Sequence, residues 1–381
     1  MMRFPLWLLP LTMVLSGCHS FEPKVEILRW KENKQAAVAL TFDDWTPGHP
    51  AIVVPELQKR GMVATFNVIT ANVKDWEPLR HAASLGNEIA NHTTTHPHPY
   101  GISFEDEVAA AERKIEAEIP GYKVYTFAYP YGETTDSLKQ YLAGNGYWAA
   151  RGTNTPMTDD DFAADTHLRD PQRASDSSKV NGPIDYMDTK TYSILSETPL
   201  SDYAEQLNHA KRVGGMVTFL YHSVYNDSIR DFSYAWITDT VLRQQLDTLA
   251  SLDLWVTTYA DMMHYHRQYA NTTIEKVKSS SNEYAFRLKE RQPKIFGDAY
   301  RPLSILVTMP NAEHITVVQN TDKLGDSSSF QEIVKAYGTE KAEIKPNGSL
   351  QLPVTIIQPN QILFNAIPNI GDITLIMQPS H

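Results

Sequence analysis

The sequence predicts an α/β barrel followed by a small C-terminal β-sandwich-like domain. Short, continuously apolar segments alternate with helix-like segments in the first two thirds of the chain, as is typical of parallel strands covered by helices. In the last third, alternating apolar and polar residues are interrupted by Pro and by Asn347-Gly348, as is typical of antiparallel strands. A chain of 381 residues is also long enough for one large and one small domain.

The barrel prediction rests on eight apolar segments and three helix-like segments. The candidate strands are Ala36–Phe42, Met62–Val68, Glu88–Asn91, Val124–Tyr129, Tyr147–Arg151, Tyr192–Leu195, Met216–Tyr221 and Leu254–Thr258. The candidate helices are Phe104–Ile119, Ser201–Val213 and Ile237–Leu252. In (β/α) barrels the chemistry lies at the C-terminal ends of the strands, so functional residues are expected there.

The C-terminal domain is expected to follow a linker at Lys278–Asn282. Its candidate strands are Tyr284–Leu288, Ser304–Thr308, His314–Val318 and Leu350–Ile357, and Ser329–Tyr337 is its one helix-like segment. We therefore divide the chain into a signal peptide (1–18), a tether (19–34), a barrel (35–276) and an accessory β-sandwich domain (283–381).

The first eighteen residues have the pattern of an export signal. Arg3 precedes an apolar run from Phe4 to Leu15, which is too short for a transmembrane helix. Leu15-Ser16-Gly17-Cys18 resembles the bacterial lipobox, in which the cysteine is lipidated and becomes the new N-terminus. We expect an exported, membrane-anchored lipoprotein of the bacterial cell envelope, in the periplasm or at the cell surface. An ordinary cleaved signal is the alternative.

Charge and cysteine content narrow the functional classes. The formal net charge of −11 is unfavourable for binding a nucleic-acid backbone, so no nucleic-acid partner is expected. Cys18 is the only cysteine, which excludes an intrachain disulfide. The sequence gives no sign of an obligate protein partner.

Four polar segments follow candidate strands. Thr41–Asp44 ends in two adjacent carboxylates, which repel each other unless a cation or a proton lies between them. Asn91–His96 has two histidines four residues apart, a spacing that can bring two imidazoles to one metal when the segment turns. Phe127–Gly132 contains a Pro-Tyr-Gly turn, which can aim a backbone N–H at an oxyanion. Phe219–His222 ends in a histidine. Each has a plain structural interpretation alone: a solvated acid pair, a chance spacing, a tight turn and a structural histidine.

Together these segments resemble carbohydrate esterase family 4, the polysaccharide deacetylases with a NodB-homology domain. Thr41-Phe42-Asp43-Asp44, His92-Thr93-Thr94-Thr95-His96, Pro130-Tyr131-Gly132 and Leu220-Tyr221-His222 match the family's motifs in order. The resemblance covers residues 36–265 and implies a distorted, incomplete barrel. It also implies hydrolysis of N- or O-acetyl groups on a polysaccharide, which would be the substrate and partner.

The resemblance also implies a role for each matching residue. Asp44, His92 and His96 would hold a divalent metal, Zn or a similar ion, and such a ligand set also suits Co, Ni or Fe. Asp43 would be the base that activates water at the metal, and His222 the acid. The backbone N–H of Tyr131 would help to polarise the acetyl carbonyl. His98 competes with His96 as the second imidazole ligand and ranks below it.

The sequence departs from the family pattern at three places. Ala128 stands where the family has an arginine that orients the base; Arg151, at the end of the next predicted strand, could supply that charge, and Arg169 is a weaker candidate. The family's Asp-x-x-Asp-Trp segment has no match, and Asp165, Asp170 or Asp185 could pair with His222 in its place. Trp45 replaces a small residue and either borders the site or packs in the core.

Substrate contacts and two other functions stay open. Asp-, Ser- and Pro-rich residues 153–190 are expected to line a groove, and Tyr100, Tyr131, Tyr186 and Tyr225 are candidates for stacking on sugar. The alternatives are a metal-dependent amidase acting on a small, non-sugar C–N bond and a catalytically inactive carbohydrate-binding lipoprotein. The C-terminal domain could bind glycan, extend the groove or only pack against the barrel.

Overall fold

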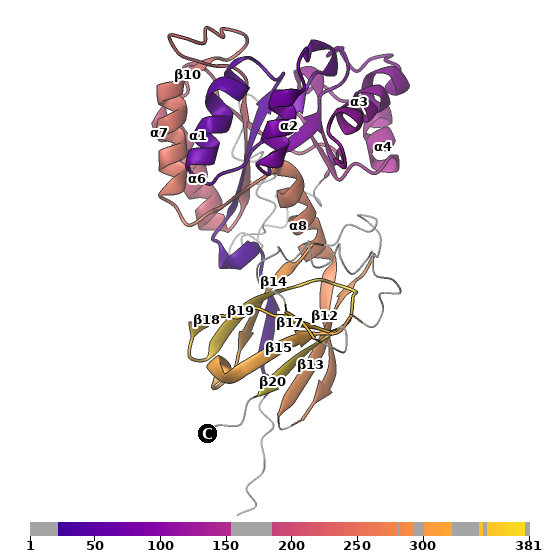
Figure 1. The fold of residues 1–381 in the computed structure, drawn as a ribbon, viewed down its shortest axis with the longest axis vertical. Helices are drawn as coiled ribbons and strands as arrows, with labels where there is room; N and C mark the ends of the chain where they lie inside the picture. Colours follow the sequence, from indigo (N-terminus) through magenta and orange to yellow (C-terminus); the bar gives the residue numbers. More distant parts are fainter. Residues whose placement is uncertain are drawn as a thin grey trace, which may run out of the picture.

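A computed structural model describes residues 22–153, 185–280, 282–292, 301–321, 343–345 and 349–377. The expected signal with Cys18, most of the expected groove loop with Asp165, Arg169 and Asp170, and the helix-like segment 329–337 lie outside these residues. The described chain forms a barrel and a pair of β-sheets, with helix α8 (Tyr259–Asn271) running between them (Figure 1).

The barrel is built on one parallel sheet with the strand order β6-β5-β4-β3-β2-β8-β7, and β11 also pairs with β2. Its strands are β2 (Ala37–Asp43), β3 (Thr65–Val68), β4 (Glu88–Asn91), β5 (Thr126–Ala128), β6 (Ala149–Arg151), β7 (Tyr192–Ser193), β8 (Met216–Tyr221) and β11 (Trp255–Thr257). The two ends of this order approach each other through a single isolated bridge, Arg151 to Thr189, within the described residues. The barrel is therefore incomplete, and the predicted fold class is confirmed.

Helices cover the outside of this sheet (Figure 1). They are α1 (Val54–Lys59), α2 (Glu77–Ser84), α3 (Ala110–Glu118), α4 (Asp136–Gly144), α6 (Leu200–Val213) and α7 (Asp239–Ala250). The hydroxyls of Thr135 and Thr238 accept hydrogen bonds from the first turns of α4 and α7, which satisfies otherwise unpaired N–H groups. Helix α6 ends at Gly214, whose φ of 63° is readily adopted by glycine.

The two faces of β2 contribute to two different hydrophobic cores. Val38, Leu40 and Phe42 belong to the core of the barrel, together with residues of the surrounding helices. Ala37 and Ala39 point the other way and share a second core with α8 and the C-terminal sheets. Because successive strand residues face opposite sides, one strand serves both cores.

The C-terminal domain is a pair of antiparallel sheets around that second core, which confirms the predicted β-sandwich. One sheet has the order β1-β14-β19-β18 and the other β12-β13-β20-β15-β17-β16. The strands are β1 (Lys24–Ile27), β12 (Thr272–Ser279), β13 (Glu283–Glu290), β14 (Leu303–Thr308), β15 (Ile315–Gln319), β16 (Glu343–Ile344), β17 (Leu350–Leu352), β18 (Thr355–Gln358), β19 (Gln361–Ala366) and β20 (Asp372–Met377).

The structure differs from the sequence-based expectations at both borders of the barrel. Strand β1 lies in the segment expected to be a tether, and it pairs with β14 in the C-terminal domain. The expected linker is wrong: Lys278 and Ser279 belong to β12, which pairs with β13 as a hairpin. Strand β12 starts directly after α8, so the helix leads straight into this sheet. No helix in the described part of the chain is long and apolar enough to cross a membrane.

Candidate active site

The predicted site residues converge at the carboxyl edge of the parallel sheet. Asp43 and Arg151 are the last residues of β2 and β6, and His92 and His222 directly follow β4 and β8. Parallel strands end at the same edge, so four segments distant in sequence meet there. The structure thus brings together residues of three of the four segments that the sequence singled out, and the fourth, Phe127–Gly132, contacts them through the Ala128 carbonyl oxygen, 2.8 Å from His92 Nδ1.

Asp43 is a buried carboxylate held by two side chains. Its Oδ1 accepts a hydrogen bond from the Asn67 amide at 2.8 Å and makes an ion pair with the Arg151 guanidinium. Burial raises the pKa of Asp43, but Arg151 and then His92 outweigh it, so that the pKa falls below its ordinary value. The carboxylate is therefore ionised, and its Oδ2 faces His92 Nε2 at 3.8 Å.

Arg151 lies where a replacement for the missing motif arginine was sought. Ala128 and Arg151 are paired neighbours on β5 and β6, so the guanidinium approaches Asp43 from the adjacent strand. Arg151 is completely buried, which makes an ionised partner necessary. Its Nε and Nη1 have no hydrogen-bond partner within the described ranges. The geometry thus gives Asp43 the positive neighbour that Ala128 cannot provide.

The turn that carries both histidines is fixed by Glu107. The Glu107 carboxylate accepts hydrogen bonds from the backbone N–H groups of Thr94 and Thr95, at 3.1 and 2.9 Å, and from the Thr95 hydroxyl. Thr93 and His96 have positive φ angles of 67° and 64°, uncommon for residues with a side chain. This backbone turns His96 back toward His92, and their ring centroids are 4.8 Å apart.

Asp44, His92 and His96 form a cluster suited to a divalent metal. Each offers one ligand atom, and these atoms all lie within 4.8 Å of one another. His92 Nδ1 lies 2.8 Å from the Ala128 carbonyl oxygen, to which it can only donate, so in the neutral imidazole Nε2 carries the lone pair. That lone pair is 3.5 Å from Asp44 Oδ1, a buried atom without a hydrogen-bond partner in the described chain.

Two electron-pair donors that face each other in a buried site need a positive charge between them. Burial raises the pKa of Asp44, but His92 beside it outweighs this and brings the pKa to about 2. Burial lowers the pKa of His92, and Asp43 and Asp44 more than compensate, so that its pKa is raised. Two imidazoles and a carboxylate are also a donor set that first-row divalent metals prefer. The residues present therefore fit a metal.

Three other residues that the sequence analysis proposed for the site are Tyr131, His98 and Asp185. Tyr131, with φ of 59°, packs its ring on His96 at 4.5 Å. His98 pairs with Glu133 at 3.0 Å instead of joining the metal cluster. Asp185 pairs with Lys139 at 2.9 Å and not with His222, so that candidate partnership is wrong; the segments with Asp165, Arg169 and Asp170 are not described.

Two aromatic side chains that were candidates for the site, Trp45 and Tyr186, have other surroundings. Trp45 packs its ring against Phe66 with centroids 5.0 Å apart, so it is largely a core residue. Tyr186 lies over the Arg267 guanidinium and hydrogen-bonds His266. Neither ring is placed to stack on a sugar.

His49 is a site residue that the sequence analysis missed. It is buried, and its Nε2 donates to the backbone carbonyl of His222 at 2.6 Å. Burial lowers its pKa to about 4, so the ring is neutral. His49 thereby holds the turn that carries His222. A lone histidine five residues beyond the acid pair has no spacing that signals this contact. Asn67 was also missed, although it lies one residue before the end of β3, where it pairs with Asp43.

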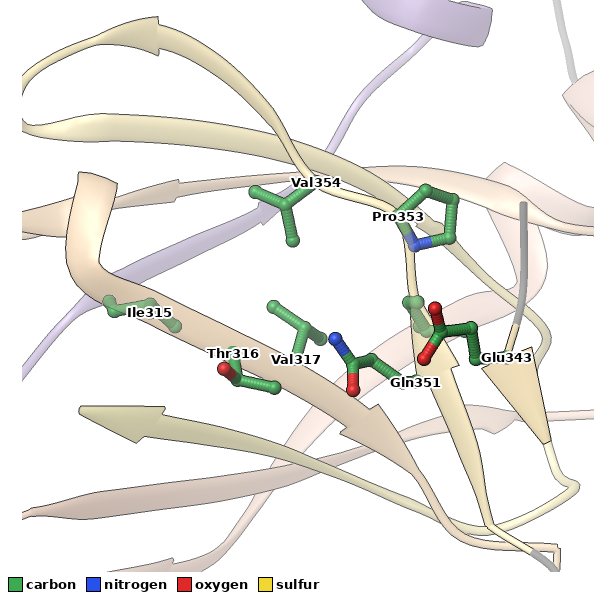
Figure 2. Close-up of a pocket in the computed structure, with 8 residues that line it drawn as sticks. Ile315, Thr316, Val317, Glu343, Gln351, Pro353 and Val354 are labelled. Atoms are coloured by element: carbon green, nitrogen blue, oxygen red, sulfur yellow. The ribbon is translucent and has the colours of Figure 1, made fainter. Parts of the chain in front are cut away.

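A second hollow, of about 280 Å³, lies in the C-terminal domain between β15 and β17 (Figure 2). It is lined mainly by aliphatic side chains and by Gln351 and Glu343. It has no aromatic lining residue and no cluster of catalytic groups, so it does not compete with the carboxyl edge of the barrel.

Comparisons with known proteins agree with this geometry. Residues 31–150 match the family model described as polysaccharide deacetylase. The chain is 34% identical over 128 residues to a chitooligosaccharide deacetylase of Sinorhizobium fredii, covering 32% of this chain and 58% of that protein. It is 24% identical over 301 residues to a gellan lyase of a Bacillus species, covering 75% of this chain and 12% of that protein.

Among solved structures, a protein from Mycobacterium smegmatis that is assigned to the polysaccharide deacetylases overlaps 63% of this chain and 93% of its own. The TM-score is 0.44 and the sequence identity 17%. The chain spans 58% or less of the length of the two curated relatives named above. Residues 31–150, which contain Asp43, Asp44, His92 and His96, thus resemble the polysaccharide deacetylases.

Proposed function

We propose that the protein hydrolyses N- or O-acetyl groups on a polysaccharide, releasing acetate and a free amine or hydroxyl. The observation that carries this proposal is the arrangement of an ionised, buried Asp43 beside the Asp44, His92 and His96 cluster, with His222 on the neighbouring strand. Serine or cysteine nucleophiles are not needed, because a divalent ion bound at such a cluster polarises a carbonyl oxygen and lowers the pKa of water.

Asp43 is proposed as the general base. Its Oδ1 is engaged by Asn67 and Arg151, so Oδ2, on the side of the metal cluster, is the oxygen that can take a proton from water. Arg151 keeps the carboxylate ionised and therefore ready to accept the proton. A positioned base of this kind contributes about 10²–10⁴-fold to a reaction rate.

His222 is proposed as the general acid that returns a proton to the leaving nitrogen or oxygen. Its backbone is fixed by His49, and its ring is turned toward Tyr234 at a centroid distance of 4.8 Å. Burial lowers the pKa of His222, and Asp43 and Asp44 oppose this effect. Tyr131 lies on the opposite side of the cluster, where its backbone N–H would bind the developing oxyanion.

The test is acetate release from acetylated glycans by protein lacking residues 1–18. Chitin oligomers, peptidoglycan and acetylated xylan would be compared, with and without a chelator and after adding zinc back. We expect release that the chelator abolishes, zinc restores and Asp43→Asn removes. Release only from small amides would support the amidase alternative, and glycan binding without any release would support an inactive binding protein.

The metal cluster has a test that does not depend on activity. Bound metal would be counted by mass spectrometry after dialysis against zinc, cobalt, nickel or iron(II). We expect about one ion per chain, lost in both His92→Ala and His96→Ala and retained in His98→Ala, since only the first two donors join the cluster. Equal retention in all variants would place the metal elsewhere.

We further propose that the protein is exported and anchored by a lipid on Cys18. The support is the sequence pattern Arg3, apolar run, Leu15-Ser16-Gly17-Cys18. Labelling expressing cells with a fatty-acid analogue should mark the wild type and not Cys18→Ser. Unlabelled wild type in the medium or periplasm would favour an ordinary cleaved signal.

A further inference from the structure

The segment between β8 and α7 exposes a group of aromatic side chains. Phe232, Tyr234 and Trp236 are 55%, 68% and 38% exposed, and all three lie within five residues of sequence. Large aromatic rings bury well, so several exposed together need an explanation. A single exposed ring would need none.

Three of the rings pack against one another to form a small platform. Tyr225 lies 4.6 Å from Phe232 and 5.2 Å from Trp236, and Phe232 lies 5.8 Å from Trp236, all as centroid distances. Trp236 meets Tyr225 and Phe232 edge to face, at 81° and 89°, which are favourable contacts, and Tyr225 is tilted by 48° against Phe232. These contacts hold the three orientations while leaving Phe232 and Trp236 open to solvent.

The backbone beneath the platform is anchored on both sides. Val224–Tyr225 (β9) pairs with Ile237–Thr238 (β10), which closes the base of the loop. Inside the loop, the buried Asp231 accepts hydrogen bonds from Ser233 and, at 3.4 Å, from the backbone N–H of Gly48. A Cβ on Gly48 would lie 1.9 Å from the Val224 carbonyl oxygen, so this close approach requires glycine.

The platform is continuous with the site described above. Tyr234, in the same loop, contacts the ring of His222, and the loop is bonded to the segment that follows Asp44. On the other side of the site, Tyr131 is 54% exposed and stacks on His98 with centroids 4.1 Å apart. Aromatic rings thus border the site beside His222 and beside His96, as an extended chain crossing the site would require.

The charge of the loop indicates a neutral ligand. Between Ser223 and Trp236 it carries Asp227, Arg230 and Asp231, and the Asp231 carboxylate is engaged within the protein. No group of basic side chains accompanies the rings that could bind an anionic polymer. Apolar ring faces bind the C–H faces of uncharged sugars, whose hydroxyls stay in water at the ring edges.

We propose that Tyr225, Phe232 and Trp236 form a sugar-stacking subsite for a neutral polysaccharide, next to the unit whose acetyl group is removed. The proposal rests on the proposed deacetylase function, which defines the sugar unit that lies next to this subsite. It deepens that function because it makes a polymer the preferred substrate. Preordered rings lower the entropic cost of binding, so the platform adds affinity for long chains that short ones cannot use.

The first experiment measures binding without chemistry. Migration of the protein through native gels would be compared with and without glycol chitin, acetylated xylan or anionic polygalacturonate. We expect retardation by a neutral polymer, and an affinity weakened about tenfold in Phe232→Ala/Trp236→Ala. Ile356→Ala is the matched control, since Ile356 is also 55% exposed but lies on β18 of the C-terminal domain.

The second experiment measures kcat/KM on acetylated disaccharides and hexasaccharides. The preference of the wild type for the hexasaccharide should fall about tenfold in the double variant, through KM, and remain in Ile356→Ala. Retardation of the protein by glycan in native gels without any acetate release would contradict the proposed deacetylase function but not the sugar-stacking subsite. Acetate release with an unchanged length preference and unchanged retardation would overturn the subsite.

A protein partner or a second copy could also cover these rings. Sedimentation of the wild type and the double variant over a range of concentrations separates this outcome. Dissociation of a dimer in the double variant, with glycan retardation unchanged, would overturn the proposal.

Discussion

Asp43 and Glu88 are both buried carboxyl groups of the same parallel sheet, at its carboxyl and amino edges respectively. Asp43 faces Arg151, and the pKa of Asp43 is lowered although burial raises it. In the described part of the chain, the donors that reach Glu88 are neutral: the hydroxyls of Thr65 and Thr126 and the backbone N–H of Ala260. Burial raises the pKa of Glu88 to about 6.

The difference shows that the charge of the partner decides in which direction the pKa of a buried carboxyl group moves. At the amino edge, Glu88 and Thr65 bind the first N–H groups of α8 and so fix the helix that joins the barrel to the C-terminal domain. At the carboxyl edge, a guanidinium keeps Asp43 ionised. The amino edge of the sheet thus binds helix α8, and the carboxyl edge carries the residues proposed for catalysis.

The largest effect is expected at the carboxyl edge, from Asp43→Asn. The amide cannot take a proton from water, so deacetylation of the preferred glycan should fall about 10³-fold. The measurement is kcat/KM with saturating metal, with near-ultraviolet circular dichroism to verify the fold. Glu88→Gln is the matched change at the amino edge and should leave kcat/KM within about twofold. Equal losses in both variants would mean that Asp43 acts through stability alone.

The next largest effect is expected from breaking the buried ion pair. Arg151→Met leaves Asp43 buried without its counter-charge, which should reduce the free energy of unfolding by about 3–5 kcal/mol. Urea denaturation with chelator present measures this without a contribution from metal. Combining Arg151→Met with Asp43→Asn should cost clearly less than the sum of the single changes. Additive losses would show that the two side chains do not interact.

The sequence predicted the barrel well because its strands are continuously apolar. Every predicted barrel strand overlaps an observed one, and the polar motifs follow directly. The same reasoning marked Arg151 as a candidate, since it ends the strand after Ala128. It did not mark Asn67, which lies one residue before the end of β3.

What the sequence did not predict depends on contacts that are distant along the chain. Helix α8 has buried residues all round, because the barrel sheet and the C-terminal sheets cover opposite sides, and this removes a helical apolar stripe. Strand β1 has four residues and pairs with Leu303–Thr308, so no local pattern marks its partner. The contact of His49 with His222 likewise exists only in the folded chain.

A smaller effect, and one that depends on pH, is expected from Glu88→Gln. The raised pKa means that the folded wild type binds a proton between pH 4.5 and about 6, so its stability falls as pH rises through that window. The amide removes this loss. The stability of Glu88→Gln relative to wild type, measured as the difference in the free energy of unfolding, should therefore be about 2 kcal/mol higher at pH 7 than at pH 4. A difference that does not change with pH would contradict the neutral environment assigned to Glu88.

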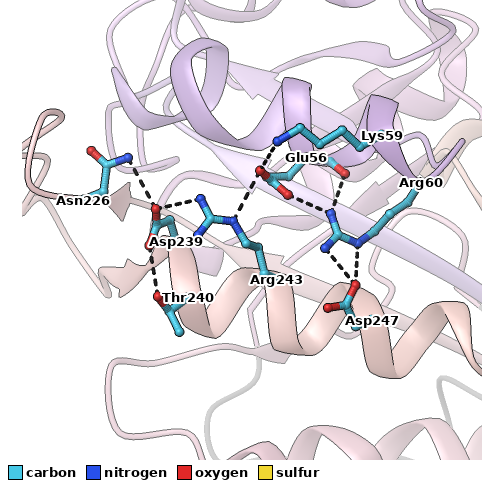
Figure 3. Close-up of polar contacts among 8 residues, drawn as sticks. All are labelled: Glu56, Lys59, Arg60, Asn226, Asp239, Thr240, Arg243 and Asp247. Carbon is cyan, nitrogen blue, oxygen red and sulfur yellow. Dashed lines mark hydrogen bonds and ion pairs between the residues drawn. The ribbon is translucent and has the colours of Figure 1, made fainter.

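The smallest effect is expected from Glu56→Gln on the outer helices. Glu56 of α1 is bonded to Lys59, Arg60 and Arg243, and these contacts connect α1 to α7 (Figure 3). Burial raises the pKa of Glu56, but the hydrogen bonds from these cations bring it to about 2. Stability from Glu56 is therefore present above pH 4.5 and lost as pH falls toward 2, opposite in direction to Glu88.

Because the cations are partly solvent-exposed, Glu56→Gln should cost only about 1 kcal/mol at pH 7, and less at pH 3. Glu77→Gln is the control, since Glu77 pairs with Arg80 at 3.0 Å on an exposed surface and should change stability by under about 0.5 kcal/mol. Urea titrations of the three proteins at both pH values measure the effect. A loss of unfolding free energy in Glu56→Gln that occurs only at low pH would show that the positive partners do not lower the pKa of Glu56. The contrast with Glu88 would then be wrong.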